Sequence, residues 1–216
     1  MTDFDVTSKA KEIGDTYYEK RKFENLPWYV KSVITRQEKE ISKILSKGEY
    51  KSILEIGCGY GRFTEILEEI LHPKKFVAVD LNYSLIEIAK KRLSNNIEFH
   101  CSSIQDFKSN EKFELVFCGV ILMMISKKDI EEVIKKIISL STKKIITIDP
   151  IEYYPGKTKE YAFIHNYKEI FERLGGKNVK MYEVPIPFSS RIVSKYAKFR
   201  GRSPITKQGI FEVDIE

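Results

Sequence analysis

A short segment of the chain combines a carboxylate and glycines in a spacing that could hold a small charged ligand. The glutamate and the three alternating glycines are Glu55, Gly57, Gly59 and Gly61. Glycine permits positive φ angles and leaves room beside its backbone, so a ligand can lie against such a turn. The apolar run before the glycines is typical of a strand, and the residues after them are typical of a helix. The first N–H groups of that helix are free to meet a ligand.

A second carboxylate lies where a ribose would be expected. Asp80 ends the apolar run at residues 76–79, roughly 20 residues after the glycines, at the position that accepts ribose hydroxyls in such folds. Dinucleotide-binding proteins share this feature, but their fingerprint, G-x-G-x-x-G, needs a glycine at the position of Arg62. Glu55 would repel a pyrophosphate, whereas it suits an ammonium group. The segment therefore favours a ligand that is cationic near the glycines.

The pattern E-x-G-x-G-x-G resembles the first motif of the class I methyltransferases that use S-adenosylmethionine (SAM). The resemblance extends over residues 50–216. It implies SAM as the cofactor, S-adenosylhomocysteine as the product, and methyl transfer to an oxygen or nitrogen atom of a small metabolite, with anionic metabolites among the candidates. The residues that it implies at the cofactor are Glu55, Gly57, Cys58, Gly59, Gly61, Asp80, Leu81, Ser103, Ile104 and Cys118.

Two further segments depart from the usual residues of this family. Ser103 stands where the family binds adenine and where an acidic residue is frequent. Asp106 either replaces that acid or caps the following turn, and Ile104 lies against either the adenine or the core. After the fourth expected strand, Met123 and Met124 occupy positions that often carry a polar group, which indicates an apolar wall.

His165 is the candidate general base of the implied reaction. Methyl transfer needs alignment of the acceptor and often the removal of one proton, and imidazole titrates near neutral pH. A structural role for His165 stays open. Nucleobase methyltransferase signatures are absent, because Cys118-Gly119-Val120-Ile121 replaces (D/N/S)-P-P-(Y/F) and no proline precedes a cysteine. No metal is expected, since Cys118 replaces the aspartate of metal-dependent catechol-type relatives.

A basic cluster at residues 191–202 leaves the class of acceptor open. Its basic residues are Arg191, Lys195, Lys198, Arg200 and Arg202. Such a cluster suits an anionic small molecule or an RNA, and it is equally compatible with a solvated surface. A tRNA or rRNA methyltransferase is therefore one alternative. A non-catalytic protein that binds SAM or a dinucleotide is another.

Strands and helices are expected to alternate from residue 51 onward. Apolar runs typical of strands occur at residues 52–56, 76–79, 97–101, 113–118, 144–148, 179–184 and 210–215. This alternation implies right-handed crossovers. We therefore predict an α/β fold, a seven-stranded mostly parallel sheet with helices on both faces, whose last strand is antiparallel as in the family. Residues 1–47 are expected to form an N-terminal helical cap, and residues 48–216 the SAM-binding domain.

Composition sets the remaining bounds. The 216 residues suit one domain, and 42% hydrophobic residues suffice for a core. The net charge of +6 suits an anionic partner, although lysine is frequent along the whole chain. The 3 cysteines lack CxxC spacing, which argues against a disulfide framework and a zinc site. No apolar run approaches the roughly 20 residues of a membrane helix, and no secretory signal is evident, so the cytoplasm is the expected compartment.

Overall fold

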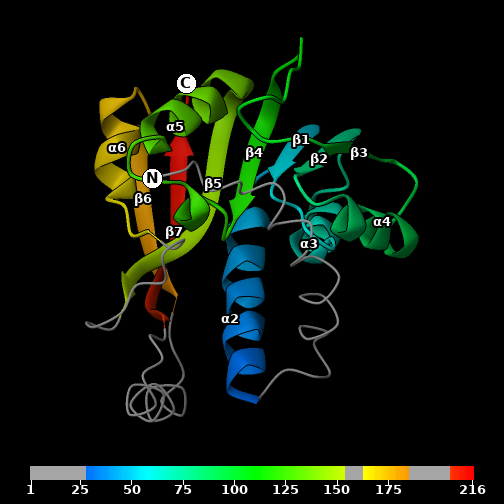
Figure 1. Ribbon diagram of the computed structural model, residues 1–216, viewed down its shortest axis with the longest axis horizontal. Helices are drawn as coiled ribbons and strands as arrows, with labels where there is room; N and C mark the ends of the chain where they lie inside the picture. Colours follow the sequence, from blue (N-terminus) through cyan, green and yellow to red (C-terminus); the bar gives the residue numbers. More distant parts are fainter. Residues whose placement is uncertain (1–27, 154–162, 185–204) are drawn as a thin grey trace, which may run out of the picture.

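The strands of the chain form a single mixed sheet. The computed structural model describes residues 28–153, 163–184 and 205–216 (Figure 1). They contain a seven-stranded sheet with the order β3-β2-β1-β4-β5-β7-β6. The strands are β1 (Ser52–Ile56), β2 (Lys75–Asp80), β3 (Ile97–Cys101), β4 (Phe113–Gly119), β5 (Ser141–Tyr153), β6 (Lys177–Val184) and β7 (Ile205–Asp214). The first five strands pair in parallel, whereas β7 runs antiparallel to both β5 and β6.

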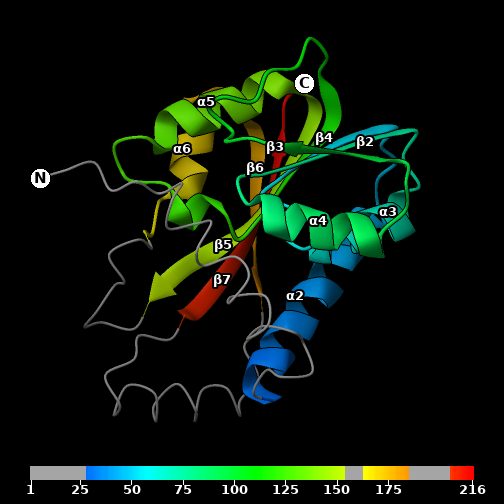
Figure 2. The ribbon, with the colours of Figure 1, turned by 45° about the vertical axis from the view of Figure 1, so that its right-hand side comes forward.

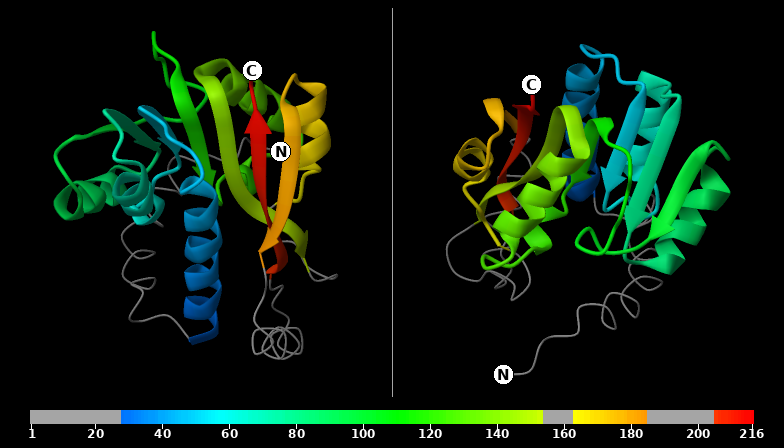
Figure 3. Two further views of the ribbon diagram at one scale, coloured as in Figure 1. Left: turned by 180° about the vertical axis from the view of Figure 1, so that it is seen from behind. Right: turned by 90° about the horizontal axis from the view of Figure 1, so that it is seen from above.

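Helices cover both faces of the sheet (Figure 3). One face carries α2 (Trp28–Leu45), α3 (Arg62–Leu71) and α4 (Tyr83–Arg92), and the other carries α5 (Ile130–Leu140) and α6 (Tyr167–Arg173). A short 3-10 turn, η2 (Leu122–Met124), follows β4. The first turns of α2 extend past the arrowhead of β4 (Figure 1), and Figure 2 shows the same helix extending below α4. This helix therefore borders the edge at which the parallel strands end.

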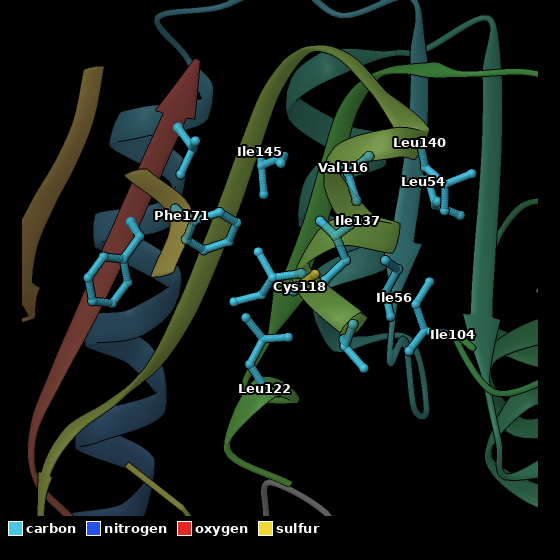
Figure 4. Close-up of a cluster of buried hydrophobic side chains, with 14 of the residues drawn as sticks. Leu54, Ile56, Ile104, Val116, Cys118, Leu122, Ile137, Leu140, Ile145 and Phe171 are labelled. Carbon is cyan, nitrogen blue, oxygen red and sulfur yellow. The ribbon is translucent and has the colours of Figure 1, made fainter. Parts of the chain in front are cut away.

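Alternating side chains of the central strands fill two separate cores. On β1, Leu54 and Ile56 pack on the side of α5 and α6, while Ile53 packs on the side of α2 and α3. On β4, Cys118 belongs to the first core and Phe117 to the second. Figure 4 shows the first core. Burial on both faces explains why these strands appear in the sequence as nearly continuous apolar runs.

The predicted fold class is confirmed, including the antiparallel last strand. The main difference concerns length, because the strand predicted over residues 144–148 runs from Ser141 to Tyr153. Its outer part pairs with β7, where Asp149 lies opposite Gly209. The apolar run marks only the portion of β5 that is buried on both faces. The remaining length depends on a strand that is distant in the sequence.

α2 packs as part of the same unit as the sheet. Ile41 has no exposed surface and belongs to the core between the helix and the strands. A buried polar pair adds a second tie, because Gln37 Nε2 donates a hydrogen bond to Gln208 Oε1 on β7 over 2.7 Å. The boundary expected after residue 47, between a cap and a SAM-binding domain, stays a prediction.

Two of the predicted features lie outside the described residues, namely residues 1–27 of the expected cap and the basic cluster at residues 191–202. Within the described residues, no helix has the length and apolar character that crossing a bilayer requires. The same part of the chain contains no group of three or more histidine, cysteine, aspartate or glutamate side chains placed to hold a metal ion.

Truncation of Ile41 tests whether α2 belongs to the folding unit. Ile41→Ala is expected to lower the free energy of unfolding by about 2–5 kcal/mol, because it removes buried contacts and leaves a cavity. Urea denaturation followed by circular dichroism measures this change. Lys39→Ala, at an exposed position of the same helix, is the matched control and should change stability by less than about 0.5 kcal/mol. Equal stability of the two variants would show that α2 contributes little to the core.

Candidate functional site

The glycine loop, residues 57–61, joins β1 to α3. Its three glycines have φ angles of 76°, 54° and 88°, which residues with a Cβ rarely adopt. Space is also restricted, because a Cβ at Gly57 would lie 2.8 Å from Ile121 Cγ1. The loop is fastened to the neighbouring strand, since Gly57 N–H donates to the carbonyl oxygen of Val79 over 2.7 Å. The backbone of the turn is therefore held close to the end of β2.

Asp80 connects the end of β2 to the glycine loop. Parallel pairing places Ile56 opposite Val79, so Asp80 lies level with the first residue of the loop. Its Oδ2 accepts a hydrogen bond from Gly59 N–H and its Oδ1 accepts one from Asn82 N–H, each over 2.8 Å. Burial raises the pKa of this carboxyl, and these backbone N–H groups oppose the rise. Each oxygen keeps a further lone pair, so Asp80 can also accept hydrogen bonds from a ligand.

Glu55 is a buried carboxyl with one unpartnered oxygen. The residue is 1% exposed, and its Oε2 has no hydrogen-bond partner within the described part of the chain. Burial raises the pKa of Glu55 to about 8, and the Asp80 carboxylate adds to this rise. A ligand that brought an N–H donor with positive charge would supply the missing partner and favour the ionised form. Together the two acids suit a ligand with a cationic group and hydroxyls.

The segment predicted to border adenine forms a turn that closes on itself. Ser103 Oγ donates to Asp106 Oδ2 over 2.6 Å and accepts from Asp106 N–H over 3.0 Å. Asp106 was expected either to bind adenine or to cap the following turn. The hydrogen bonds with Ser103 correspond to the second role, and the contact with adenine stays a prediction. Ile104 is buried in the core with Ile56 (Figure 4), whereas Leu81 is 43% exposed. Leu81 therefore presents more accessible apolar surface next to Asp80 than Ile104 does.

The end of β4 is closely packed. Cys118 has no exposed surface and lies among apolar side chains that face α5 (Figure 4), and burial raises the pKa of its thiol. A Cβ at Gly119 would lie 2.3 Å from Phe63 Cδ2, so this glycine lets α3 approach the strand. Further on, Met123 is partly buried and Met124 is 45% exposed. Of the two methionines, Met124 offers the more accessible apolar surface.

His165 is held against the residues that follow η2. Its Nε2 lies 3.0 Å from the carbonyl oxygen of Ile125, so Nε2 carries the proton in this contact. Burial lowers the pKa of the ring, which keeps the imidazole neutral near neutral pH. The lone pair of a neutral imidazole then resides on Nδ1, which can accept a proton. A base is chemically available, and its part in catalysis stays a prediction.

Sequence reasoning missed Asp149 as a member of this edge of the sheet. The residue is fully buried, and it accepts hydrogen bonds from Met123 N–H over 3.0 Å and from the Thr147 hydroxyl over 2.6 Å. Burial raises its pKa to about 7. The available signal was a carboxylate directly after an apolar strand, because parallel strands end at the edge where ligands bind.

Sequence reasoning also missed a chain of hydrogen bonds that begins at Arg62, the first residue of α3. Arg62 Nη1 donates to Gln37 Oε1 over 2.9 Å, and Gln37 in turn donates to Gln208. Helical spacing from the buried residues Ile41 and Ile44 places Gln37 on the buried side of α2, which was the available signal. The start of α3 is thus tied through α2 to β7.

Curated relatives and a family model match the part of the chain that contains this site. Residues 53–144 match a family described as a methyltransferase domain. A malonyl-[acyl-carrier protein] O-methyltransferase from Bacillus anthracis is 27% identical over 136 residues, which cover 58% of this chain and 50% of the relative. One from Acetivibrio thermocellus is 35% identical over 65 residues, 30% of this chain and 23% of the relative. The chain therefore spans half or less of the length of these curated relatives.

Solved structures share the whole fold. The magnesium protoporphyrin IX methyltransferase of Synechocystis PCC 6803 with bound SAM has a TM-score of 0.71 at 12% identity, and the match covers 100% of both chains. At this identity the likeness concerns the fold alone. The family match includes the glycine loop and Asp80, and it supports the resemblance predicted from the sequence. Residues 53–144 therefore match a methyltransferase domain, and the chain has the fold of the class I SAM-dependent methyltransferases.

Proposed function

We propose that this protein transfers a methyl group from SAM to an oxygen or nitrogen atom of a small metabolite. The observation that carries the proposal is the Asp80 carboxylate bound to Gly59 N–H beside the unpartnered oxygen of Glu55. This arrangement combines a glycine turn that has free space at Gly59, oxygen atoms that can accept hydrogen bonds from hydroxyls, and a buried acid that has no salt bridge within the described residues. A dinucleotide would bring its pyrophosphate close to the Asp80 carboxylate and would supply no cation to the buried Glu55, so the same groups disfavour it.

The residues proposed to hold the cofactor fall on the turn and on the strand ends around it. Glu55 is proposed beside the aminoacyl ammonium, and Asp80 beside the ribose hydroxyls. The remaining proposed contacts are Gly57, Cys58, Gly59, Gly61, Leu81, Ser103, Ile104 and Cys118. When bound, SAM supplies a methyl group on a sulfonium, which the acceptor displaces in line. The task of the chain is to orient both partners and to accept a proton where the acceptor carries one.

The acceptor is proposed to approach at the edge where β4 and β5 end. Met124 offers apolar surface there, and a neutral His165 can take a proton on Nδ1. The two curated relatives described above are named O-methyltransferases, which favours an oxygen acceptor. The net charge of +6 favours an anionic one.

The alternatives predicted from the sequence receive less support. The RNA hypothesis depends on the basic cluster at residues 191–202, which is outside the described residues.

We retain the cytoplasm as the proposed compartment, in agreement with three cysteines that are free thiols. We also retain the proposed division into a cap, residues 1–47, and a SAM-binding domain, residues 48–216.

Calorimetry with SAM, S-adenosylhomocysteine and NAD tests the choice of cofactor. SAM and S-adenosylhomocysteine are expected to bind and NAD is not. Binding of NAD alone would instead indicate a dinucleotide-binding protein.

Transfer of a labelled methyl group from SAM to a panel of small acids, small amines and tRNA tests the reaction. Labelling of tRNA alone would favour the RNA alternative, and SAM binding without any transfer would favour a non-catalytic protein.

Removing the charge of Asp80 tests the proposed ribose contact. Asp80→Asn should weaken the affinity for S-adenosylhomocysteine by about tenfold to a hundredfold, because hydrogen bonds to a charged group are stronger than those to a neutral one. Calorimetry measures the affinity. Glu98→Gln removes a carboxylate from an exposed position on β3 and should leave the affinity unchanged. If both variants bind equally well, the ribose assignment of Asp80 is wrong.

Glu55 predicts that a proton is released when the aminoacyl group binds. With a pKa of about 8, the carboxyl is mostly protonated at pH 6.5. A neighbouring ammonium favours the carboxylate, so the pKa falls on binding and about one proton leaves. Calorimetry with S-adenosylhomocysteine at pH 6.5, in phosphate and in imidazole buffer, measures this release, because the two buffers differ in ionisation enthalpy. The observed heat should therefore depend on the buffer.

Glu55→Gln is the matched variant for this measurement. Glutamine has nearly the same size and cannot ionise, so the heat of binding should become nearly independent of the buffer. A heat that is already independent of the buffer in the unsubstituted protein would contradict the placement of Glu55 beside the ammonium.

A further inference from the structure

Asp149 is a buried acid outside the residues proposed to contact the cofactor. A buried carboxyl lowers stability unless hydrogen bonds replace the lost water. Both oxygens of Asp149 are used, since Oδ1 accepts from Met123 N–H over 3.0 Å and Oδ2 accepts from the Thr147 hydroxyl over 2.6 Å. The backbone of Leu122 adds a further hydrogen bond to the carboxyl. Asp149 thus binds backbone N–H groups of η2 that would otherwise need a water molecule as their hydrogen-bond acceptor.

The segment that Asp149 holds is strained. The β4 exit loop, residues 120–125, begins at Val120 with a φ angle of 61°. A β-branched residue is unfavourable in this left-handed conformation. Val120 N–H donates to the carbonyl oxygen of Ile148 over 2.7 Å, immediately before Asp149 on β5. Such a conformation persists only where surrounding contacts enforce it, and the end of β5 supplies two of them.

The exit loop is also held from a second part of the chain. Phe163 N–H donates to the carbonyl oxygen of Met123 over 2.8 Å, and His165 Nε2 donates to that of Ile125 over 3.0 Å. The peptide groups on both sides of Met123 are therefore bound, one by Asp149 and the other by Phe163. The exit loop is a clamped element between two strands and the segment before α6.

The exit loop contacts the glycine loop through Ile121. A Cβ at Gly57 would lie 2.8 Å from Ile121 Cγ1 and 3.0 Å from Ile121 Cβ, so this side chain packs directly against the glycine. Val120 and Leu122, on either side of Ile121, are both anchored to the end of β5. Movement of the exit loop would therefore withdraw Ile121 from Gly57.

We propose that Asp149 is a positioning residue that sets the shape of the cofactor site through the β4 exit loop. It holds η2, keeps Ile121 against Gly57, and thereby fixes the glycine loop in the form that receives SAM. The proposal rests on the proposed function for the identity of the ligand, whereas the clamp is a property of the ligand-free chain. Because the clamp needs an acceptor oxygen at Oδ1, asparagine should serve in place of Asp149 and alanine should not.

Hydrogen exchange of the ligand-free protein tests the clamp directly. Asp149→Ala leaves the Met123 N–H without its buried acceptor, so exchange within residues 120–125 should become about tenfold faster or more. The affinity for S-adenosylhomocysteine, measured by calorimetry, should fall by about tenfold or more. Asp149→Asn should keep both quantities within about threefold of the unsubstituted protein, because its amide oxygen still accepts the hydrogen bond.

Ile145→Ala is the control for a general loss of stability. Ile145 is fully buried on the same strand and in the core on the same side of the sheet, and its truncation is expected to destabilise the protein at least as much. This variant should leave both exchange in residues 120–125 and the affinity near their original values. An equal effect of Ile145→Ala and Asp149→Ala would overturn the proposal.

Val120→Gly provides a test of rescue. Glycine adopts a positive φ without strain, so the exit loop should need less support from Asp149. Adding Val120→Gly to Asp149→Ala should recover about half or more of the lost affinity on a logarithmic scale, a result that a merely structural role for Asp149 does not produce. Unchanged affinity in the double variant would contradict the link between strain and clamp.

Thr147→Val covers the case in which Asp149→Ala does not fold. It removes the donor to Asp149 Oδ2 and should speed hydrogen exchange in residues 120–125 more than elsewhere. Unchanged exchange in these residues would overturn the clamp.

The proposed function and the proposed clamp can be contradicted independently of each other. If the unsubstituted protein binds no S-adenosylhomocysteine, the proposed function is wrong, while hydrogen exchange still decides whether Asp149 holds the exit loop.

Discussion

The parallel pairing of β1 between β2 and β4 is the constraint on which the site depends. It places Ile56 opposite both Val79 and Cys118, so the glycine loop, Asp80 and the exit from β4 leave the sheet at one level. Alternation along β1 then directs Glu55 to the side of α3, while its neighbours fill the core under α5. A slip of one residue would exchange these faces and bury the acid in that core. The apolar residues on both faces of the sheet therefore fix the strand register, and the register fixes where the carboxylates lie.

Acids with raised pKa values gather at this edge, and a network of paired charges lies at the opposite end of β5. Burial raises the pKa of Glu55, Asp80 and Asp149, and none of the three has a salt bridge within the described residues. At the other end of β5, Lys144 lies between Glu212 and Asp214 and lowers the pKa of Asp214. Ion pairs of this kind support a fold, while buried acids without a cation lower its stability. Their persistence at one edge is typical of a site that meets a ligand.

Local signals explain what could be predicted from the sequence. The bounds of β1 and β3 were predicted to the residue, because each apolar run is short and ends at polar or glycine residues. The contact of Asp80 with the glycine loop also follows locally, since consecutive parallel strands end side by side. β5 and β7 were predicted too short, because their outer parts pair mainly with each other. The contacts of Gln37 with Arg62 and Gln208 join three distant segments, so no local pattern revealed the network as a whole.

The exit loop contains a backbone conformation that its own residue disfavours. Valine at position 120 disfavours the φ angle that it adopts, and the loop keeps this form because Ile148, Asp149 and Phe163 hold it from separate parts of the chain. The anchors act on the backbone of the loop, whereas Met124 projects an accessible side chain from it. Under the proposed function, residues at such exposed positions can change with the acceptor while the clamp and the glycine loop stay the same. Cofactor binding and acceptor choice would then depend on different residues of one connected edge.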